Sequence, residues 1–366
     1  MKIILIERMG FGVHVGSYYL CRYGSRLHDI TFLGFATDRR TEPLPNVRVR
    51  EVGRHGGRVA RYVRLISEIC DEIRRGYDLV FLVYFPGCSL LKVLNPQVRF
   101  VFDIRSGATR LNRARRWRAN RLLRLEASLF ENVTIISEGL RERLGFKEQR
   151  TTLLPLGGLS VECAAKRFDK IRLLYIGNIT RNRRLDVTVR GLALFREKYG
   201  LDDIEVYDMV GDGYENELTE LRALIMQLGL QDHVRTHGYI PRDRVDSFFE
   251  RANIGVSFVP ITEFFDVQPV TKTYEYLLSG MPVLATATTE NTRVVNAANG
   301  VLVKDTPEAF ADGLREIVAN RARYDPANIK STARCHSWEY LMKTIYLPYI
   351  ARVVSSRGAK NLSLGS

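Results

Sequence analysis

The chain has 366 residues, about twice the usual length of one domain, so two domains are expected. Its composition, 45% hydrophobic and 10% aromatic, excludes a disordered or fibrous protein. The formal net charge is +14, and residues 1–160 carry 28 basic against 15 acidic side chains, a net of +13. The remaining residues carry 27 basic and 26 acidic side chains. An anionic partner is therefore expected at the first half alone.

The N-terminus and the cysteines indicate a protein of the reducing cytosol. Residues 1–8 reach an acid and a base after four apolar residues, which predicts a buried strand instead of a signal peptide. The longest apolar run, residues 79–91, contains Pro86 and Gly87 and is too short to span a bilayer. The five cysteines are scattered without a Cys-x-x-Cys pair, which argues against a disulfide framework and a structural zinc.

Short apolar runs alternate with helical patterns along the chain, which predicts an α/β protein with two Rossmann-like doubly wound domains facing a cleft. In the first half we expect a helix over 59–75 and strands at 3–6, 29–34, 79–84, 99–102, 133–136 and 152–154. In the second half we expect strands at 171–176, 204–210, 234–236, 254–258, 282–285 and 301–303. The predicted parts are a first domain over 1–158, a linker within 157–169, a second domain over 170–335, a helix over 336–354 and a disordered tail over 355–366.

Two loops of the second half contain glycine and lie between a predicted strand and a predicted helix. In the first loop, Gly177 and Asn178 precede Arg183, whose guanidinium near a helix N-terminus suits phosphate oxygens. The second loop allows a tight turn and close approach of a ligand, and consists of Gly211, Asp212 and Gly213. Each loop alone is a weak signal, because a solvated loop or a plain strand-to-helix turn has the same composition.

The segment 268–286 is more specific. A helix begins after Pro269 and ends at Gly280, before a strand. Lys272 and Glu275 are three residues apart, so they share one face of that helix. There the carboxylate could accept hydrogen bonds from a ribose diol while the lysine neutralises phosphate. The alternative is an exposed salt pair of little energetic value.

Taken in order, these segments resemble the glycosyltransferase family 4 group, whose members have the GT-B fold. The spaced match covers roughly residues 170–320, and the order of five segments is much more specific than any one of them. The matching residues are Gly177 and Arg183, Val210 to Gly213, Leu228 to Pro241, Ala252 to Val256, and Lys272 to Val283.

The resemblance implies a retaining, hexosyltransferase-like enzyme that uses a nucleotide-sugar donor at the second domain and a saccharide or lipid-linked acceptor at the first. It implies that Arg183 and Lys272 neutralise the donor diphosphate and that Glu275 binds the ribose. Other expected donor contacts are Gly177, Asn178, Gly211, Asp212, Gly213 and His237. The sequence has no Asp-x-Asp string, so we expect no metal and no cofactor, with fixed cations stabilising the leaving diphosphate.

One position departs from the acidic pattern of the family. The family has a first glutamate eight residues before the one that Glu275 resembles, whereas this chain has Val267 there. Glu263 and Asp266 lie nearby and are expected to approach the donor sugar as the catalytic carboxylates. Asn178 and Arg183 also occupy positions where arginine and lysine are common in the family.

The first half resembles the family less closely. Gly10 and Gly12 resemble the glycine-rich first loop of such enzymes, and Arg105 follows a strand in a segment that resembles a cleft-lining one. His14 follows the glycine loop and could face the cleft, although a lone histidine is more often a satisfied surface or core residue. These residues are the expected acceptor side of the cleft. The six histidines form no zinc motif.

Residues 109–128 predict a helix in which arginines and apolar residues alternate. Arg113, Arg116, Trp117 and Arg118 are expected to contact an anionic membrane surface, with the indole at headgroup depth. An ordinary solvated face, or an apolar side packed on the sheet, are the alternatives. A lipid-linked acceptor requires the first domain to reach the bilayer. We therefore interpret the chain as a cytoplasmic, peripheral membrane enzyme of surface or extracellular polysaccharide biosynthesis at the inner face of the cell membrane.

Two other function classes compete with this interpretation. The basic first half would also suit a protein that binds nucleic acid or another polyanion, but Trp117 is the only aromatic residue between Arg105 and Arg124, and no nucleic-acid-reading motif is present. Nucleic acid is therefore not an expected partner. A nicotinamide-dependent dehydrogenase lacks its fingerprint, because no Gly-x-Gly-x-x-Gly follows the first strand.

Overall fold

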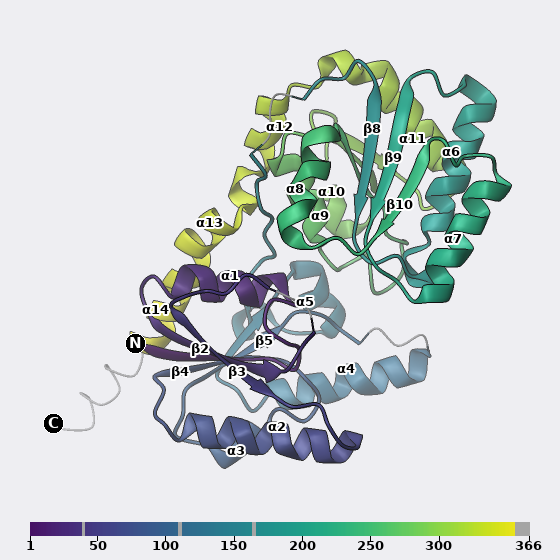
Figure 1. Cartoon of the computed structure of the whole chain (residues 1–366). Helices are drawn as coiled ribbons and strands as arrows, with labels where there is room; N and C mark the ends of the chain where they lie inside the picture. The colour runs from purple at the N-terminus through teal and green to yellow at the C-terminus, as the bar shows by residue number, and fades with distance from the viewer. Residues whose placement is uncertain (39–40, 109–111, 163–165, 356–366) are drawn as a thin grey trace. The chain divides into compact units, whose positions relative to one another are not determined.

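The computed structural model describes residues 1–38, 41–108, 112–162 and 166–355 (Figure 1). These form two compact units: unit 1 comprises Met1–Pro155 together with the C-terminal segment from Trp338, and unit 2 comprises Leu156–Ser337. Each unit has its own sheet, and every strand pairing in both sheets is parallel. The predicted pair of parallel α/β domains is confirmed.

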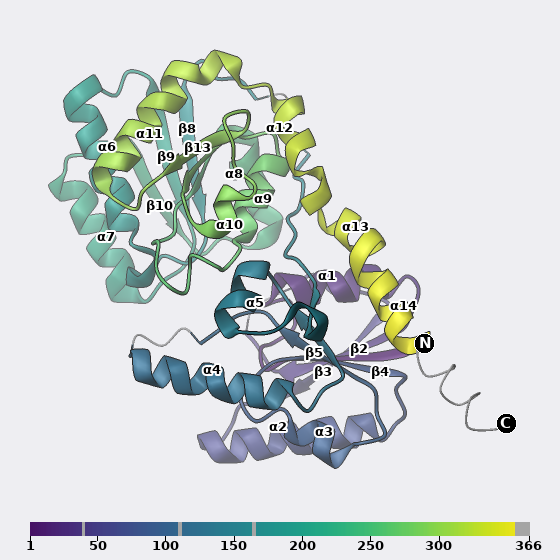
Figure 2. The same ribbon diagram turned by 180° about the vertical axis from the view of Figure 1, so that it is seen from behind.

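Unit 1 contains a seven-stranded sheet with the order β3-β2-β1-β4-β5-β6-β7. Helices α2, α3 and α4 lie on one face of this sheet and α1 on the other (Figures 1 and 2). The strands are β1 (Lys2–Ile6), β2 (Asp29–Phe35), β3 (Val47–Val52), β4 (Leu79–Val83), β5 (Phe100–Ile104), β6 (Asn132–Ile135) and β7 (Thr152–Leu153). The helices are α1 (Val15–Gly24), α2 (Arg58–Ile73), α3 (Leu90–Leu94), α4 (Arg113–Ala127) and α5 (Glu138–Leu144).

Strand β3 is absent from the sequence-based prediction. It forms the edge of the sheet, and its apolar residues alternate with the charged residues Arg48 and Arg50, so it has no continuous apolar run. Both arginines form ion pairs with Glu72 of α2, a buried carboxylate. The predicted helix over 59–75 corresponds to α2, whose buried residues begin at Leu65, so Val63 is exposed.

Unit 2 contains a six-stranded sheet with the order β10-β9-β8-β11-β12-β13. Its strands are β8 (Ile171–Ile176), β9 (Ile204–Val210), β10 (Val234–Gly238), β11 (Ile254–Ser257), β12 (Val283–Thr286) and β13 (Gly300–Val303). Its helices are α6 (Leu185–Tyr199), α7 (Glu215–Gln227), α8 (Arg242–Arg251), α9 (Thr271–Leu278), α10 (Thr289–Thr292), α11 (Pro307–Asn320) and α12 (Pro326–Ala333).

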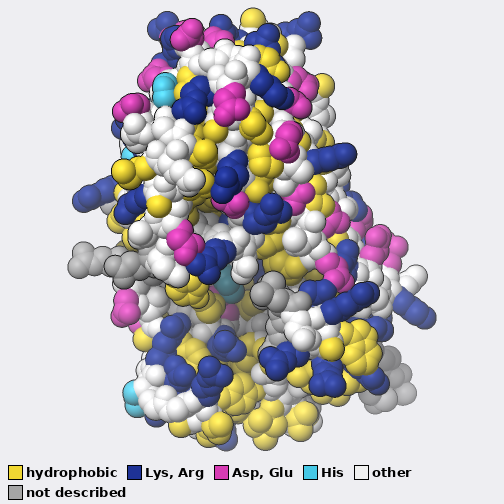
Figure 3. All heavy atoms as spheres, turned by 90° about the vertical axis from the view of Figure 1, so that its right-hand side faces the viewer, with side chains coloured by type: hydrophobic (Ala, Val, Ile, Leu, Met, Phe, Trp, Pro, Cys, Tyr) yellow, Lys and Arg dark blue, Asp and Glu magenta, His cyan; other side chains and the backbone are white. Residues whose placement is uncertain are grey.

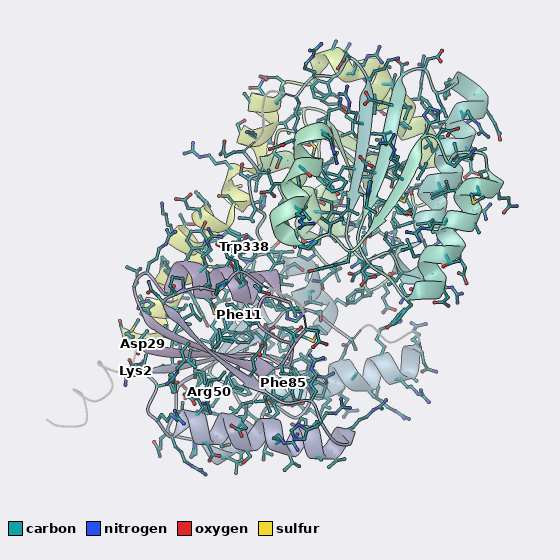
Figure 4. The ribbon with its side chains drawn as sticks, in the orientation of Figure 1. Lys2, Phe11, Asp29, Arg50, Phe85 and Trp338 are labelled. Carbon is teal, nitrogen blue, oxygen red and sulfur yellow. The ribbon has the colours of Figure 1, made fainter. Side chains whose placement is uncertain are left out.

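The last helical segment belongs to unit 1, although it follows unit 2 in the chain. It comprises α13 (Trp338–Leu341), a π-helical stretch (Met342–Tyr346) and α14 (Leu347–Ser355). The Trp338 ring stacks on Tyr19 of α1, and the Tyr346 hydroxyl donates to the Pro155 carbonyl at 2.9 Å. Figure 4 labels Trp338 beside α1. Residues 356–366 of the predicted tail lie outside the described residues.

Candidate functional site

The strand order of each sheet reverses beside its first strand, at β1 and β4 in unit 1 and at β8 and β11 in unit 2. Open parallel sheets bind ligands at the carboxyl ends of the strands near such a reversal. The sequence-predicted donor residues follow β8 and β9, lie near the end of β10 or lie on α9 in unit 2, and the predicted acceptor residues follow β1 and β5 in unit 1. Each group therefore lies at the edge of its own sheet where a ligand is expected.

The two glycine loops of unit 2 pack directly on each other. The backbone amide of Ile179 donates to the Asp212 carbonyl at 2.7 Å, and that of Gly177 donates to the Val210 carbonyl at 3.0 Å. A Cβ atom at Gly211, where φ is +151°, would fall on the Gly177 carbonyl oxygen, and one at Gly213 would fall on the Ile179 carbonyl oxygen. Contact between the two backbones is thus a sufficient reason for glycine at both positions.

Lys272 is a buried cation without an acidic hydrogen-bond partner. Its ammonium lies 3.6 Å from the centre of the Tyr175 ring, and its Nζ atom makes no hydrogen bond among the described residues. Burial first, and then the charge of Arg183, lower the pKa of this amine well below its usual 10.5, and Glu275 offsets part of that change. Because this amine is already removed from water, binding an anionic ligand beside it costs little further desolvation free energy of the amine.

Arg183 is the second cation of this site. It ends a short 3-10 helix (Arg181–Arg183), and Arg184 then turns the chain with a left-handed φ of 51°. The Arg183 guanidinium lies over the Phe265 ring at 4.6 Å, and its Nη1 atom is buried without a hydrogen-bond partner in the described part of the chain. Arg183 as a whole is half-buried, but its Nη1 atom and Lys272 Nζ are both enclosed donors without partners among the described residues, and they form a candidate phosphate-binding site beside the glycine loops.

Glu275 lies on α9 and is buried, with 8% of its surface exposed, and Lys272 is equally enclosed at 9%. The alternative of an exposed salt pair is therefore wrong, because the whole of α9 from Lys272 onward is buried. Asn178, by contrast, is exposed, and its carbonyl accepts a hydrogen bond from the Tyr175 hydroxyl at 2.9 Å.

The two carboxylates near Val267 differ in their surroundings. Asp266 accepts hydrogen bonds from the backbone amide and the hydroxyl of Thr289, at 2.9 and 2.8 Å, so both of its oxygens fix the start of α10. Glu263 lies on an exposed loop, and Val267 itself is buried. Of these residues, Glu263 is exposed, Asp266 is half-buried and Val267 is buried.

His237 lies in β10, where its Nε2 atom is 2.6 Å from Oδ1 of Asp208 on β9. Its ring also packs edge-on against Phe248 of α8. The histidine therefore has structural partners on both neighbours at the carboxyl edge of the sheet.

Unit 1 has a polar cluster at the carboxyl ends of β1 and β5. Glu7, directly after β1, is 1% exposed and accepts a hydrogen bond from the Ser17 hydroxyl; His14 Nδ1 lies 3.3 Å from the same carboxylate oxygen. Asp103 at the end of β5 is fully buried, pairs with Arg105 and accepts from the Thr134 hydroxyl at 2.6 Å.

The glycine loop of unit 1 has a conformational reason for its glycines. Gly12 has φ of +78°, and a Cβ there would collide with the Thr41 side chain; one at Gly10 would collide with Thr37. The loop carries Phe11, whose ring packs against Phe32 in the core (Figure 4). These glycines therefore place the loop against the strand ends, next to His14.

Helix α4 exposes several large apolar residues. Its buried residues are Leu123, Glu126 and Ala127, whereas Trp117 and Leu125 are each 60% exposed. The alternative that the apolar side packs on the sheet is therefore wrong. Arg113 and Arg118 are exposed as well, Arg116 is half-buried, and Arg110 lies outside the described residues. On the unit 1 part of the face in Figure 3, arginine and lysine side chains gather with hydrophobic ones.

Within the described ranges, no three histidine, cysteine, aspartate or glutamate side chains gather into a potential metal site. None of the helices in the described part of the chain has both the length and the apolar character needed to cross a bilayer. Cys21, Cys70 and Cys88 are buried free thiols, and Cys335 is an exposed one.

Sequence reasoning missed several residues of these sites. Tyr175 and Phe265, which lie against the two cations, and the buried carboxylates Glu7 and Asp103 are not among the predicted site residues. Glu7 directly after an apolar strand was a usable signal, because a charged residue at a strand's carboxyl end in a parallel sheet points to the ligand-binding edge. The aromatic contacts give no comparable sequence signal.

Residues 170–320 match the family model of Glycosyl transferases group 1. Three solved structures share the fold at low sequence identity. Sucrose-phosphate synthase from Thermosynechococcus elongatus is 18% identical, covering 96% of this chain and 99% of that one, with a TM-score of 0.74. Anabaena HepE in complex with UDP and glucose is 14% identical, covering 99% of both chains, with a TM-score of 0.72.

WaaG, a glycosyltransferase involved in lipopolysaccharide biosynthesis, is 14% identical, covering 97% of this chain and 99% of that one, with a TM-score of 0.66. No curated protein matches the sequence.

Proposed function

We propose that this chain, a group 1 glycosyltransferase with the GT-B fold, transfers a sugar from a nucleotide-sugar held by unit 2 to a saccharide acceptor held by unit 1. One observation carries the donor part of the proposal: at the carboxyl edge of the unit 2 sheet, Lys272 Nζ and Arg183 Nη1 are buried donor atoms that have no hydrogen-bond partner among the described residues. A diphosphate supplies the negative charge and the acceptor oxygens that both side chains lack.

The same proposal gives roles to the other residues of the donor site. Glu275, buried one helical turn from Lys272, accepts hydrogen bonds from the ribose diol. Gly177 borders the diphosphate position, because a Cβ atom there would lie 3.2 Å from Lys272 Nζ. His237 borders the base. The two fixed cations stabilise the leaving diphosphate without a metal, and the transfer retains the anomeric configuration. Glu263, which is exposed on the loop after β11, approaches the donor sugar.

Replacing Glu275 with glutamine tests the donor site. The variant is expected to bind its nucleotide-sugar at least tenfold more weakly, because a charge-assisted acceptor becomes a neutral amide. Thermal-shift screening of the wild type against UDP-, GDP-, ADP- and dTDP-sugars selects the donor, and calorimetry then compares the two proteins. Proton NMR of the product reads its anomeric configuration.

Glu316→Gln, an exposed glutamate on α11, is the matched control and is expected to bind like the wild type. Equal donor affinity in Glu275→Gln and the control would contradict the ribose role. Stabilisation of the wild type by none of the four donors, with tight and salt-sensitive oligonucleotide binding instead, would contradict the donor site altogether.

The acceptor is proposed to be lipid-linked, and unit 1 to bind the cytoplasmic leaflet of the cell membrane during surface or extracellular polysaccharide synthesis. The support is the outward face of α4, where exposed Trp117, Leu122 and Leu125 lie among the exposed Arg113 and Arg118. Apolar side chains enter the headgroup region while arginines bind anionic lipids, each contributing about 1 kcal/mol.

Vesicle co-sedimentation tests the membrane proposal. Binding is expected to vesicles that contain anionic lipid but not to neutral ones, and to weaken at high salt. Changing Arg113, Arg118 and Arg121 to glutamate is expected to abolish it, because the triple variant reverses the charge of the exposed face.

The control changes Arg190, Arg235 and Arg244, three exposed arginines of unit 2, to glutamate. It alters the net charge equally and is expected to sediment with anionic vesicles like the wild type. Equal loss in both triple variants would assign the binding to overall charge instead of α4.

A further inference from the structure

Glu7 and His14 form a pair that the donor site does not use. Glu7 directly follows β1 in the chain, and His14 precedes α1. One Glu7 oxygen, Oε2, is shared between the Ser17 hydroxyl and His14 Nδ1, at 3.3 Å from the latter. The other oxygen, Oε1, is buried and has no hydrogen-bond partner among the described residues. A carboxylate this enclosed and incompletely satisfied calls for a functional explanation.

The contact with Glu7 fixes the state of the His14 ring. A carboxylate at Nδ1 stabilises the tautomer with the proton on Nδ1, which leaves the lone pair on Nε2. His14 is the N-cap residue of α1, and its side chain makes no capping hydrogen bond. Since 47% of that side chain is exposed, the imidazole is accessible to a ligand, whereas Glu7 behind it is not.

The titratable groups around the His14 ring come from the ends of β1 and β5 and from α1. Burial lowers the pKa of His14, but the hydrogen bond and the charge of Glu7 outweigh that effect, so the pKa is raised above its usual 6.5. On β5, Asp103 raises this pKa further, and Arg105, directly after that strand, lowers it. Cys21 on α1 is a buried thiol whose own pKa is raised, first by burial and then by Glu7, so it remains uncharged.

We propose that His14 Nε2 accepts the proton of the attacking acceptor hydroxyl and that Glu7 is the positioning residue that orients the imidazole. This inference rests on the proposed glycosyl transfer. A base at this position implies that the acceptor is an alcohol, such as a sugar hydroxyl. A neutral amine is already nucleophilic and would not need a base to attack.

Each transfer makes one bond and breaks one bond at the anomeric carbon, and both bonds lie on the same face of the sugar ring because the configuration is retained. The acceptor oxygen forms a bond to that carbon, and the bond from the carbon to the diphosphate oxygen breaks. The electron pair of the broken bond leaves on the diphosphate, and the hydroxyl proton moves to His14 Nε2. The imidazolium formed lies beside the Glu7 carboxylate, whose charge stabilises it.

The pH dependence has a defined sign. His14 must be neutral to accept a proton, so kcat/KM is expected to fall as the pH drops through a pKa above 6.5. Glu7→Gln removes the carboxylate charge that raises this pKa. The acidic limb of its profile is therefore expected to move to lower pH, while kcat falls because the ring loses its orienting partner.

The experiment measures kcat/KM against pH for the wild type, His14→Gln and Glu7→Gln, with donor affinity measured in parallel. His14→Gln is expected to lose about 10²-fold in kcat/KM and to lose the acidic limb, with donor affinity unchanged. His28→Gln is the control, because His28 precedes β2 and so lies at the amino ends of the strands, whereas His14 lies at their carboxyl ends. It is expected to retain the wild-type profile.

An acidic limb that persists unchanged in His14→Gln would overturn the inference, as would a kcat/KM within about threefold of the wild type. Either result leaves the donor site intact. If the wild type bound no donor and transferred no sugar, the proposed function itself would be contradicted. If the wild type bound and transferred its donor normally, a failure of the His14 predictions would concern the base alone. A Glu7→Gln profile identical to the wild type would overturn the positioning role.

Discussion

Replacing Lys272 with methionine is expected to lower kcat at least 10²-fold while the protein remains folded. The lysine ammonium is buried against the Tyr175 ring and has no hydrogen-bond partner among the described residues, so the fold does not depend on its charge. Methionine fills a similar volume and removes only the cation. Removing one preorganised group that stabilises developing charge costs about 10²–10³-fold in turnover.

Steady-state kinetics and calorimetric melting measure the two effects separately. Arg183→Ala is expected to reduce kcat similarly, because it removes the second cation facing the diphosphate. Arg181→Ala is the matched control: Arg181 lies two residues earlier, is exposed and pairs with Glu220. It is expected to retain wild-type turnover. Unchanged kinetics in both Lys272→Met and Arg183→Ala would exclude this site as the donor site.

The same assay examines metal independence. If the two fixed cations neutralise the leaving group, a chelator leaves wild-type kcat unchanged. A full loss that magnesium restores would contradict this role for Lys272 and Arg183.

Gly211→Ala is expected to destabilise unit 2 by about 3 kcal/mol or more and to abolish donor binding. The alanine Cβ would fall on the Gly177 carbonyl oxygen, and the φ of +151° is itself unfavourable for a residue with a side chain. Backbone strain of this kind costs about 1–3 kcal/mol, and overpacking costs a similar amount again. Because the two loops must separate to relieve the clash, Gly177 moves relative to Lys272 Nζ, which lies 3.2 Å from where a Gly177 Cβ would be, and the donor site is disrupted.

Urea unfolding and donor calorimetry measure these effects. Gly200→Ala separates the two causes, because Gly200 also has a positive φ, of 75°, but a Cβ atom there would meet no other atom within 4 Å. This control is expected to lose only the contribution of backbone strain, about 1–3 kcal/mol, and to bind donor normally. Equal effects of the two substitutions would show that loop–loop contact contributes nothing.

The sequence predicted the class of the protein better than the details of its site. Strands such as 171–176 and 204–210 match β8 and β9, because continuous apolar runs in buried parallel strands are unambiguous. The resemblance to a glycosyltransferase family with the GT-B fold is confirmed by the match over residues 170–320 and by the structural relatives. Order and spacing of motifs carry this information without any knowledge of packing.

Burial is what the sequence could not provide. The spacing of Lys272 and Glu275 places both on one helical face, but whether that face is exposed depends on the elements that cover α9. The charged edge strand β3 and the outward apolar face of α4 were ambiguous for the same reason. Whether each of these surfaces is buried depends on contacts between residues distant in the sequence, and the periodicity of the sequence does not encode such contacts.

The discontinuity of unit 1 affects the order in which the protein is made. On a ribosome, β1 to β7 emerge first, but Trp338 and Tyr346, which pack against Tyr19 and bind the Pro155 carbonyl, are synthesised only after all of unit 2. Unit 2 is continuous in sequence and can complete its core while the chain is still growing. Unit 1 must wait with part of its apolar surface uncovered, so nascent chains are most exposed to aggregation and chaperone binding there.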